Sequence, residues 1–444
     1  MSIREIAEKT LKAAMAAGAD EAEIFVREHR EFQTTVRMGE IETLKEAESK
    51  SMALRVYKNR CKAVVDSSDF RPEKLEKLAG EAVGLASVTA ADDYHRLPEP
   101  ELYAGAWPDL DLLDPQEPPS TEKRIAMAHR AESAALEVDD RIDNSMGGNF
   151  AQSHGDMLVM TSNGFSGGYP FSVYSLSAVP VAKDSKGDRS RDFWFTRALH
   201  AEDLMDAEEV GHRAAERALR MCDARRAATG EVPVIFEANA ASRLVAMIFG
   251  CISGSAVWRK QSYLGERLGE QIASEKISIV DDPLRPRGLG SQPFDSEGIL
   301  AKALRVVDKG KLAHFMHDLE SARRLNQPVT GHGSWGGGVA ASNFYLENGE
   351  GTLADLIAGV DRGLMVTGYM GSGFNTVSGN WSQGVEGLWI EGGKVAYPVK
   401  GATIAGHFDG VLNGIDAVAG DLNFNLGTKI APSLRVKSMT VSGE

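Results

Sequence analysis

Ten histidines and three cysteines are the side chains of this sequence best suited to hold a transition metal. A hydrolytic zinc site needs three protein ligands and an open position for water. No HExxH pattern occurs, and among the histidines only His314 and His317 lie close together. The pair falls on a predicted strand at 311–317, where a spacing of three places the two rings on opposite faces. A structural role is therefore the favoured interpretation, with metal ligation as the alternative.

The densest group of polar residues is 281–298, which reads DDPLRPRGLGSQPFDSEG. Paired carboxylates of this kind can carry out acid–base chemistry. Carboxylate–arginine pairs that fix a loop give the same pattern, and we favour that structural interpretation. The alternative is a metal-independent hydrolase that uses Ser291, Asp295, Glu297 or a histidine.

Two glycine-rich stretches, 331–338 (GHGSWGGG) and 368–373 (GYMGSG), could surround a ligand. Neither matches a dinucleotide-binding or Walker loop. We interpret them as conformationally free loops, or as backbone that approaches an extended peptide closely. The resulting candidates for a substrate channel or a structural loop are Asp281, Asp282, Gly290, Ser291, Asp295, Glu297, Gly298, His332, Gly336 and Gly337.

The elements that would position these residues begin with a unit at 1–90, predicted as helix, antiparallel strands and helix. Ser2 and Glu5 form a capping-box pattern at its start. Asn59-Arg60 predicts a hairpin turn, and the second helix is expected at 72–87. The expected strands are 22–27, 31–37, 40–46, 51–57 and 61–66.

A proline-rich stretch at 91–119 predicts a linker or an extended arm. The second unit, 120–227, is expected to contain two helices with strands between them. The helices are predicted at 120–138 and 202–221, and the strands at 156–161, 170–182 and 192–199.

The third unit, 228–444, is rich in glycine and strands. It begins with a strand at 232–237 and a helix at 239–252, and Thr352 and Asp355 predict a capped short helix. Hairpins are expected from 302–307 with 311–317 and from 385–390 with 394–399. The fold class expected is α+β and multi-domain.

Charge and hydropathy exclude several classes of function. The net charge of −14 argues against nucleic-acid binding, which depends on clustered lysine and arginine. No uninterrupted apolar run approaches the ~18 residues of a membrane span. The odd, sparse cysteines indicate a reducing compartment. Because the first residues also lack a signal-peptide pattern, we expect a cytoplasmic protein.

Three stretches carry recognisable motifs in order: 254–298, the HD-x3-AR segment at 317–323 and V-x-YPVKGATIAG at 395–406. These motifs resemble those of the TldD/PmbA family, once called modulators of DNA gyrase. The resemblance covers nearly the whole chain. It implies a two-subunit peptidase in which TldD-type subunits bind zinc through HExxxH and a later cysteine, whereas PmbA-type (TldE) subunits lack this set.

The resemblance places the HExxxH frame on residues 245–250, where Val245, Ala246 and Gly250 replace the two histidines and the glutamate. The later cysteine is also absent near 424–430. No catalytic residue and no metal ligand can therefore be transferred to this chain, and no cofactor is expected in it. Zinc is expected in a TldD-type partner.

These features lead to the hypothesis of a PmbA/TldE-type subunit that shapes a peptidase chamber. The implied substrates are small or unfolded peptides, as in antitoxin degradation and peptide-antibiotic maturation. The rival hypotheses are a metal-independent hydrolase and a non-enzymatic regulatory protein. The choice between a homodimer of the isolated chain and a heterodimer stays open.

Overall fold

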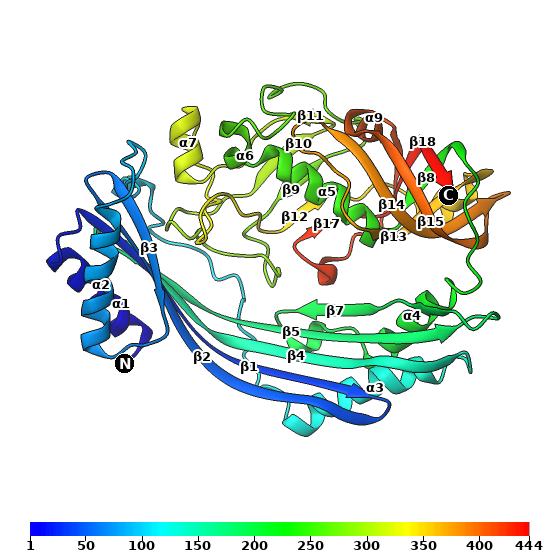
Figure 1. The fold of residues 1–444 in the computed structure, drawn as a ribbon, viewed down its shortest axis with the longest axis horizontal. Helices are drawn as coiled ribbons and strands as arrows, with labels where there is room; N and C mark the ends of the chain where they lie inside the picture. Colours follow the sequence, from blue (N-terminus) through cyan, green and yellow to red (C-terminus); the bar gives the residue numbers. More distant parts are fainter. Residues whose placement is uncertain (444) are drawn as a thin grey trace.

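The computed structural model describes residues 1–443. A long curved sheet with helices on its outer side faces a second, sheet-rich region formed by the C-terminal half (Figure 1). The α+β, multi-domain prediction is confirmed.

The sheet begins with a three-stranded meander. Strand β1 (Glu21–Arg37) pairs with β2 (Glu40–Lys58), which pairs with β3 (Cys61–Ser67). Asn59 and Arg60 both have positive φ, as the predicted hairpin turn requires. The four short strands predicted before this turn all lie within β1 and β2, but the breaks predicted at 28–30 and 47–50 are wrong. The β1–β2 ladder runs unbroken through the charged residues between them, because these side chains alternate between the two faces of the sheet.

Helices α1 (Ile3–Ala16) and α2 (Pro72–Ala86) cover one face of this meander. The capping box of Ser2 with Glu5 is present, as predicted. The apolar stripe of α1 packs onto even-numbered residues of β1, including Ile24 and Val26. Odd-numbered residues of β1 therefore face the other way, toward the C-terminal half.

The second unit extends the same sheet. Helix α3 (Thr121–Leu136) precedes β4 (Ile142–Thr161), β5 (Ser166–Lys183), β6 (Arg189–Arg191) and β7 (Trp194–Ala198), and α4 (Ala207–Leu219) follows them. The strand order is β3-β2-β1-β4-β5-β6, with β7 also on β5, so the first two units are joined through β1 and β4. The predicted helix at 202–221 starts late, because Ala201–Asp203 forms a 3₁₀ turn (η2) and Asp206 caps the first turn of α4.

The proline-rich stretch 91–119 is an ordered strap that contains a 3₁₀ turn, η1 (Pro100–Leu102). Leu97, Leu110 and Leu112 are buried. The strap hydrogen-bonds to the sheet where Ser172 N donates to Leu112 O at 2.9 Å. It thus connects the sheet to the C-terminal half along much of its length.

The C-terminal half contains two further sheets. The larger has the order β15-β14-β13-β8-β18-β16 and closes on itself because β15 also pairs with β18. Its strands are β8 (Gly230–Phe236), β13 (Arg362–Met370), β14 (Asn380–Glu391), β15 (Lys394–His407), β16 (Ile415–Val418) and β18 (Leu434–Gly443).

The smaller sheet has the order β11-β10-β9-β12-β17. Its strands are β9 (Ile279–Asp281), β10 (Leu304–Asp308), β11 (Lys311–Leu312), β12 (Phe344–Leu346) and β17 (Lys429–Ile430). The strand predicted at 311–317 is wrong after Leu312, so His314 and His317 lie outside β11. His317 instead precedes Asp318, which caps the next helix.

Helix α5 (Ala238–Ile252) lies between the sheets of this half (Figure 1). The shorter helices are α6 (Gly254–Trp258), α7 (Leu319–Leu325), α8 (Leu353–Ala358), α9 (Phe408–Asn413) and the 3₁₀ turn η3 (Phe424–Leu426). No helix within residues 1–443 is long and apolar enough to cross a membrane.

Candidate functional site

Helix α5 carries residues 245–250, onto which the family resemblance places the HExxxH frame. Val245 is 2% exposed and belongs to the apolar core of the C-terminal half. Gly250 borders open space, since a Cβ built there meets only Thr376, at 3.9 Å. Ala246 is partly buried. A methyl, an isopropyl group and a glycine offer no lone pair to a metal.

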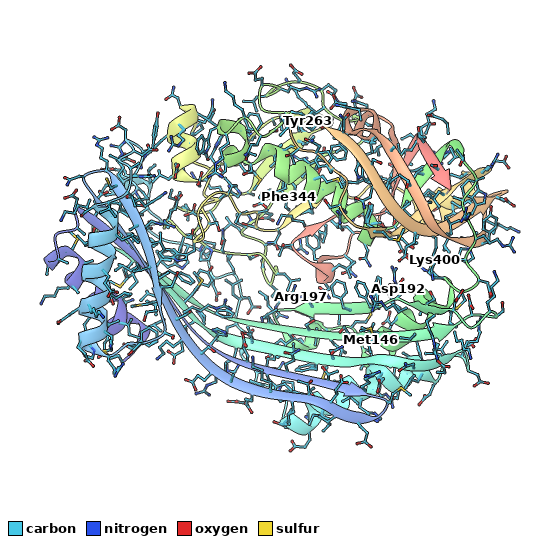
Figure 2. All side chains as sticks on the ribbon, viewed as in Figure 1. Met146, Asp192, Arg197, Tyr263, Phe344 and Lys400 are labelled. Atoms are coloured by element: carbon cyan, nitrogen blue, oxygen red, sulfur yellow. The ribbon has the colours of Figure 1, made fainter. Side chains whose placement is uncertain are left out.

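Lys429 lies next to α5. Lys429 Nζ lies 4.7 Å from the ring centroid of Phe249, and Phe249 meets Phe344 edge to face at 5.7 Å. Figure 2 labels Phe344 in the interior of the C-terminal half. Burial lowers the pKa of Lys429, while Asp281 acts in the opposite direction. An ammonium group over an aromatic ring is a poor environment for a dication, so the residues present do not fit a zinc ion.

Within residues 1–443, one group of ligand-type side chains has its atoms within 4.8 Å of one another: Asp92, His95 and Glu320. Both carboxylates already have cationic partners. Arg324 bonds to Asp92 and to Glu320, and Lys62 Nζ lies 3.1 Å from Glu320. The cluster therefore functions as an ion-pair network between the strap and α7.

Asp281, at the end of β9, and His332 form a buried pair, and both are 0% exposed. His332 Nε2 lies 3.0 Å from Asp281 Oδ2, and its Nδ1 lies 2.8 Å from Thr330 Oγ1. The other Asp281 oxygen accepts a hydrogen bond from Ser342 N at 2.8 Å. Every polar atom of the imidazole is thus held by the protein, which fixes residue 332 and the start of the glycine-rich loop.

Asn343 organises the stretch that includes Asp282, Gly290 and Ser291. Its Nδ2 donates to Asp282 O at 2.7 Å and to Ser291 Oγ at 2.8 Å, and Gly290 N donates to its Oδ1 at 2.9 Å. Ser291 Oγ in turn donates to Arg285 O at 2.5 Å. These bonds close a tight loop around one amide.

Asp295 and Glu297 are buried carboxyls that bind backbone N–H groups. Asp295 accepts from Glu297 N, Ile299 N and, at 2.7 Å, from Gly333 N. Burial raises the pKa of Asp295 to about 6 against the effect of these bonds. Burial, with the nearby charges of Asp295 and Asp318, holds the pKa of Glu297 well above its ordinary value.

The partners of these carboxyls differ from those expected. Within residues 1–443 neither Asp295 nor Glu297 has an arginine within 4.0 Å, and Arg287 instead pairs with Asp111, Glu202 and Asp203. Glu297 Oε2 accepts from Leu319 N at 2.8 Å, which holds the start of α7. The carboxyls fix loops through backbone bonds.

The glycine-rich loop 331–338 reaches across to the N-terminal sheet. Trp335 stacks on Phe25 of β1 at 5.2 Å, and its carbonyl accepts a 2.8 Å hydrogen bond from Arg55 of β2. Gly337, with φ of +86°, lines the small cavity above this contact, and a Cβ on Gly336 or Gly337 would meet nothing within 4 Å. Gly337 therefore lies at the junction between the two halves, and Gly336 precedes it in the same loop.

Gly298 is a second junction point. Its φ is +77°, a Cβ there would contact the Phe165 ring, and its carbonyl accepts from Ala104 N of the strap at 2.9 Å. The sequence did not identify the residues of the N-terminal unit that lie at the junction between the two halves, namely Glu23, Arg55 and Tyr57. The charged residues that interrupt the apolar stretch 22–27 were the available sign that this strand has a second, partly polar buried face.

The arrangement does not assemble a hydrolytic dyad from the candidates. Ser291 Oγ bonds to a carbonyl and to Asn343, whereas His332 bonds to Asp281 and Thr330. Within residues 1–443 no histidine is hydrogen-bonded to Ser291. A serine without a base in reach is not activated as a nucleophile.

Comparison with known families and proteins agrees with this architecture. Three domain models of the PmbA/TldA metallopeptidases match the chain: domain 1 at residues 22–86, the central domain at 114–221 and the C-terminal domain at 229–443. The chain is 32% identical to the metalloprotease PmbA of Escherichia coli O157:H7, over 98% of this chain and 96% of that protein. It is 31% identical to a PmbA homologue of Haemophilus influenzae, with 99% and 96% covered.

Solved structures show the same fold. A proposed modulator of DNA gyrase from Bacteroides thetaiotaomicron superposes with a TM-score of 0.93 at 27% identity, covering 99% of both chains. TldE from Thermococcus kodakarensis superposes with a TM-score of 0.88 over 99% of this chain, at 23% identity. The whole chain is thus matched in sequence and in fold, and it belongs to the PmbA/TldD family of metalloproteases.

Proposed function

We propose that this chain is a PmbA/TldE-type subunit of a two-subunit cytoplasmic peptidase and has no active site of its own. The observation that carries the proposal is the state of α5. Val245, Ala246 and Gly250 occupy the frame of the metal motif, and the ammonium group of Lys429 lies over Phe249 beside it.

A TldD-type partner would supply the zinc ion and the general base. This chain would contribute walls of the peptide chamber, formed by the inner face of its N-terminal sheet and by loops 281–298 and 331–338. The substrates would be small or unfolded peptides, including antitoxins and precursors of peptide antibiotics. Two features favour the proposal: the ligand positions are lost together, and the surrounding fold is kept.

The test is to purify the chain alone, the TldD-type partner alone and the two together. Metal content is measured by mass spectrometry and cleavage by release of a quenched fluorophore from an unfolded peptide. The expected result is metal-dependent cleavage by the mixture and neither bound zinc nor cleavage in the isolated chain. Stoichiometric zinc with chelator-sensitive cleavage by this chain alone would refute the proposal.

A further inference from the structure

A cavity of about 270 Å³ lies between the inner face of the N-terminal sheet and loop 288–291 of the C-terminal half. Two arginines line it, Arg27 from β1 and Arg197 from β7. Figure 2 labels Arg197 on the side of the sheet that faces the C-terminal half. The apolar part of the lining comes mainly from Phe25, Met157, Phe171, Val173, Leu199 and Leu289.

Arg27 is desolvated without a counter-ion. Within residues 1–443 no carboxylate lies within 4.0 Å of its guanidinium, and its buried Nε has no hydrogen-bond partner. The guanidinium stacks on Phe171, 4.5 Å from the ring centroid. Burial lowers the pKa of Arg27, with Glu31 acting in the opposite direction, but an arginine remains protonated in either case. A partly buried guanidinium group without a carboxylate partner favours an incoming anion.

Arg197 has no hydrogen bond or ion pair in the described part of the chain, and its side chain is exposed. The nearest acid on the same face of β1, Glu31, is already engaged by His29 at 2.9 Å and by Lys45 at 4.0 Å. Two unpaired guanidinium groups therefore line one cavity. The lining of this cavity is therefore positively charged, although the chain as a whole has a net charge of −14.

The cavity continues along the sheet. A second hollow of about 230 Å³ shares Val173 and Arg197 with the first and extends beside β1 to Gln33. Its lining includes the hydroxyls of Ser153 and Ser175, and Ser153 Oγ is buried without a partner. Together the two hollows form a groove with apolar and polar walls, in which Arg27 lines the first hollow, Arg197 lines both, and Glu31 lines the second.

We propose that this groove is a peptide-binding site in which Arg27 and Arg197 bind a peptide carboxylate flanked by apolar side chains. Planar guanidinium groups match a carboxylate in two-point geometry, and the apolar lining accommodates the neighbouring side chain. The carboxylate comes from the peptide C-terminus or from an Asp or Glu side chain. This inference deepens the proposed function, because it assigns a substrate-holding role to the non-catalytic subunit.

The test measures fluorescence anisotropy of labelled nine-residue peptides with the isolated, full-length chain. The first peptide has a free C-terminus after an apolar residue and no internal acid. The second is the same peptide with a C-terminal amide. The third is amidated and carries one internal Glu between apolar residues.

We expect the first or the third peptide to bind, and the one that binds identifies the source of the carboxylate. The amidated neutral peptide should bind at least about tenfold more weakly, as expected for loss of a charge-assisted hydrogen bond. Arg197→Gln and Arg27→Gln should each weaken binding by a similar factor. Arg197 is exposed, so its replacement should leave the melting temperature unchanged.

The matched control is Arg30→Gln. Arg30 lies on the same strand, faces away from the groove and pairs with Glu48 at 3.4 Å on the surface. Equal binding of the neutral and acidic peptides, equal binding by Arg197→Gln and Arg30→Gln, or no binding of any peptide at about 1 mM would overturn the inference. Because the assay needs neither metal nor partner, its failure leaves the metal and cleavage measurements of the proposed function untouched.

Discussion

Arg55 donates a 2.6 Å hydrogen bond to the Glu23 carboxylate, and both side chains are more than nine-tenths buried where the N-terminal sheet meets the C-terminal half. The same guanidinium group donates to the carbonyl of Trp335 on the glycine-rich loop. One ion pair thus joins β1 and β2 to a loop that lies 280 residues away in sequence. The two halves of the protein are therefore joined by a buried ion pair.

Replacing Arg55 by Met should destabilise the protein by about 3–5 kcal/mol, because it leaves the Glu23 carboxylate buried without a counter-ion. The free energy of unfolding is measured by urea denaturation. Arg30→Met is the control on the neighbouring strand, where an exposed pair contributes about 0–1 kcal/mol. Equal stabilities of the two variants would contradict the role given to Arg55.

The contribution of Asp295 and Glu297 to stability should fall as the pH rises from about 4 toward 8. Both carboxyls have a raised pKa in the folded protein. The folded state therefore holds protons that the unfolded chain has already lost above pH ~4.3. The stabilising contribution is complete below that pH. For Asp295 it is lost as the pH passes about 6.

Glu297→Gln should remove part of this dependence, since an amide carries no charge and can still accept from Leu319 N. The measurement is the melting temperature from pH 5 to 8, with hydrogen exchange of residues 331–338 as a local probe. The variant should melt higher than the parent at pH 8 and show a flatter profile. An unchanged slope would mean that Glu297 does not titrate in this range.

Gly290→Ala should destabilise the protein by about 1–3 kcal/mol. A Cβ at this position would lie 2.3 Å from Ser342 O, and backbone cannot move aside cheaply. Gly336→Ala is the control, because nothing lies within 4 Å of a Cβ there. The free energies of unfolding of the two variants are measured by denaturation. Equal losses would mean that the close approach of Gly290 to Ser342 O is not the reason for glycine at this position.

Ser291→Ala should leave peptide cleavage by the reconstituted pair of subunits unchanged and cost about 1 kcal/mol of stability, through loss of the bonds to Arg285 O and Asn343. Cleavage rate and unfolding free energy are measured on the same preparation. A loss of cleavage of a hundredfold or more, with stability kept, would favour the metal-independent hydrolase instead.

Local signals predicted the ends of elements well. Ser2 with Glu5 and Thr352 with Asp355 form capping boxes, and Asn59-Arg60 forms the hairpin turn, since each depends on residues adjacent in sequence. The long strands β1 and β2 were divided in the prediction because a charged stretch in a two-sided sheet resembles a turn. Only the pairing partner shows that the ladder continues.

The site depended on contacts that no sequence pattern specifies. Asp281 and His332 are 51 residues apart, and Arg55 and Trp335 are 280 apart. The sequence could not show that Arg27 and Arg197 lack carboxylate partners, because this depends on the positions of all neighbouring side chains in the structure. The absence of metal ligands on α5, by contrast, could be predicted from Val245, Ala246 and Gly250 once the family motif was recognised.

The central claim is that the chemistry belongs to a partner subunit, and metal analysis combined with a cleavage assay of the separated subunits tests it most directly. We predict no bound zinc and no cleavage for this chain alone, and chelator-sensitive cleavage once the TldD-type subunit is added. One zinc per isolated chain, with cleavage that a chelator abolishes, would contradict it.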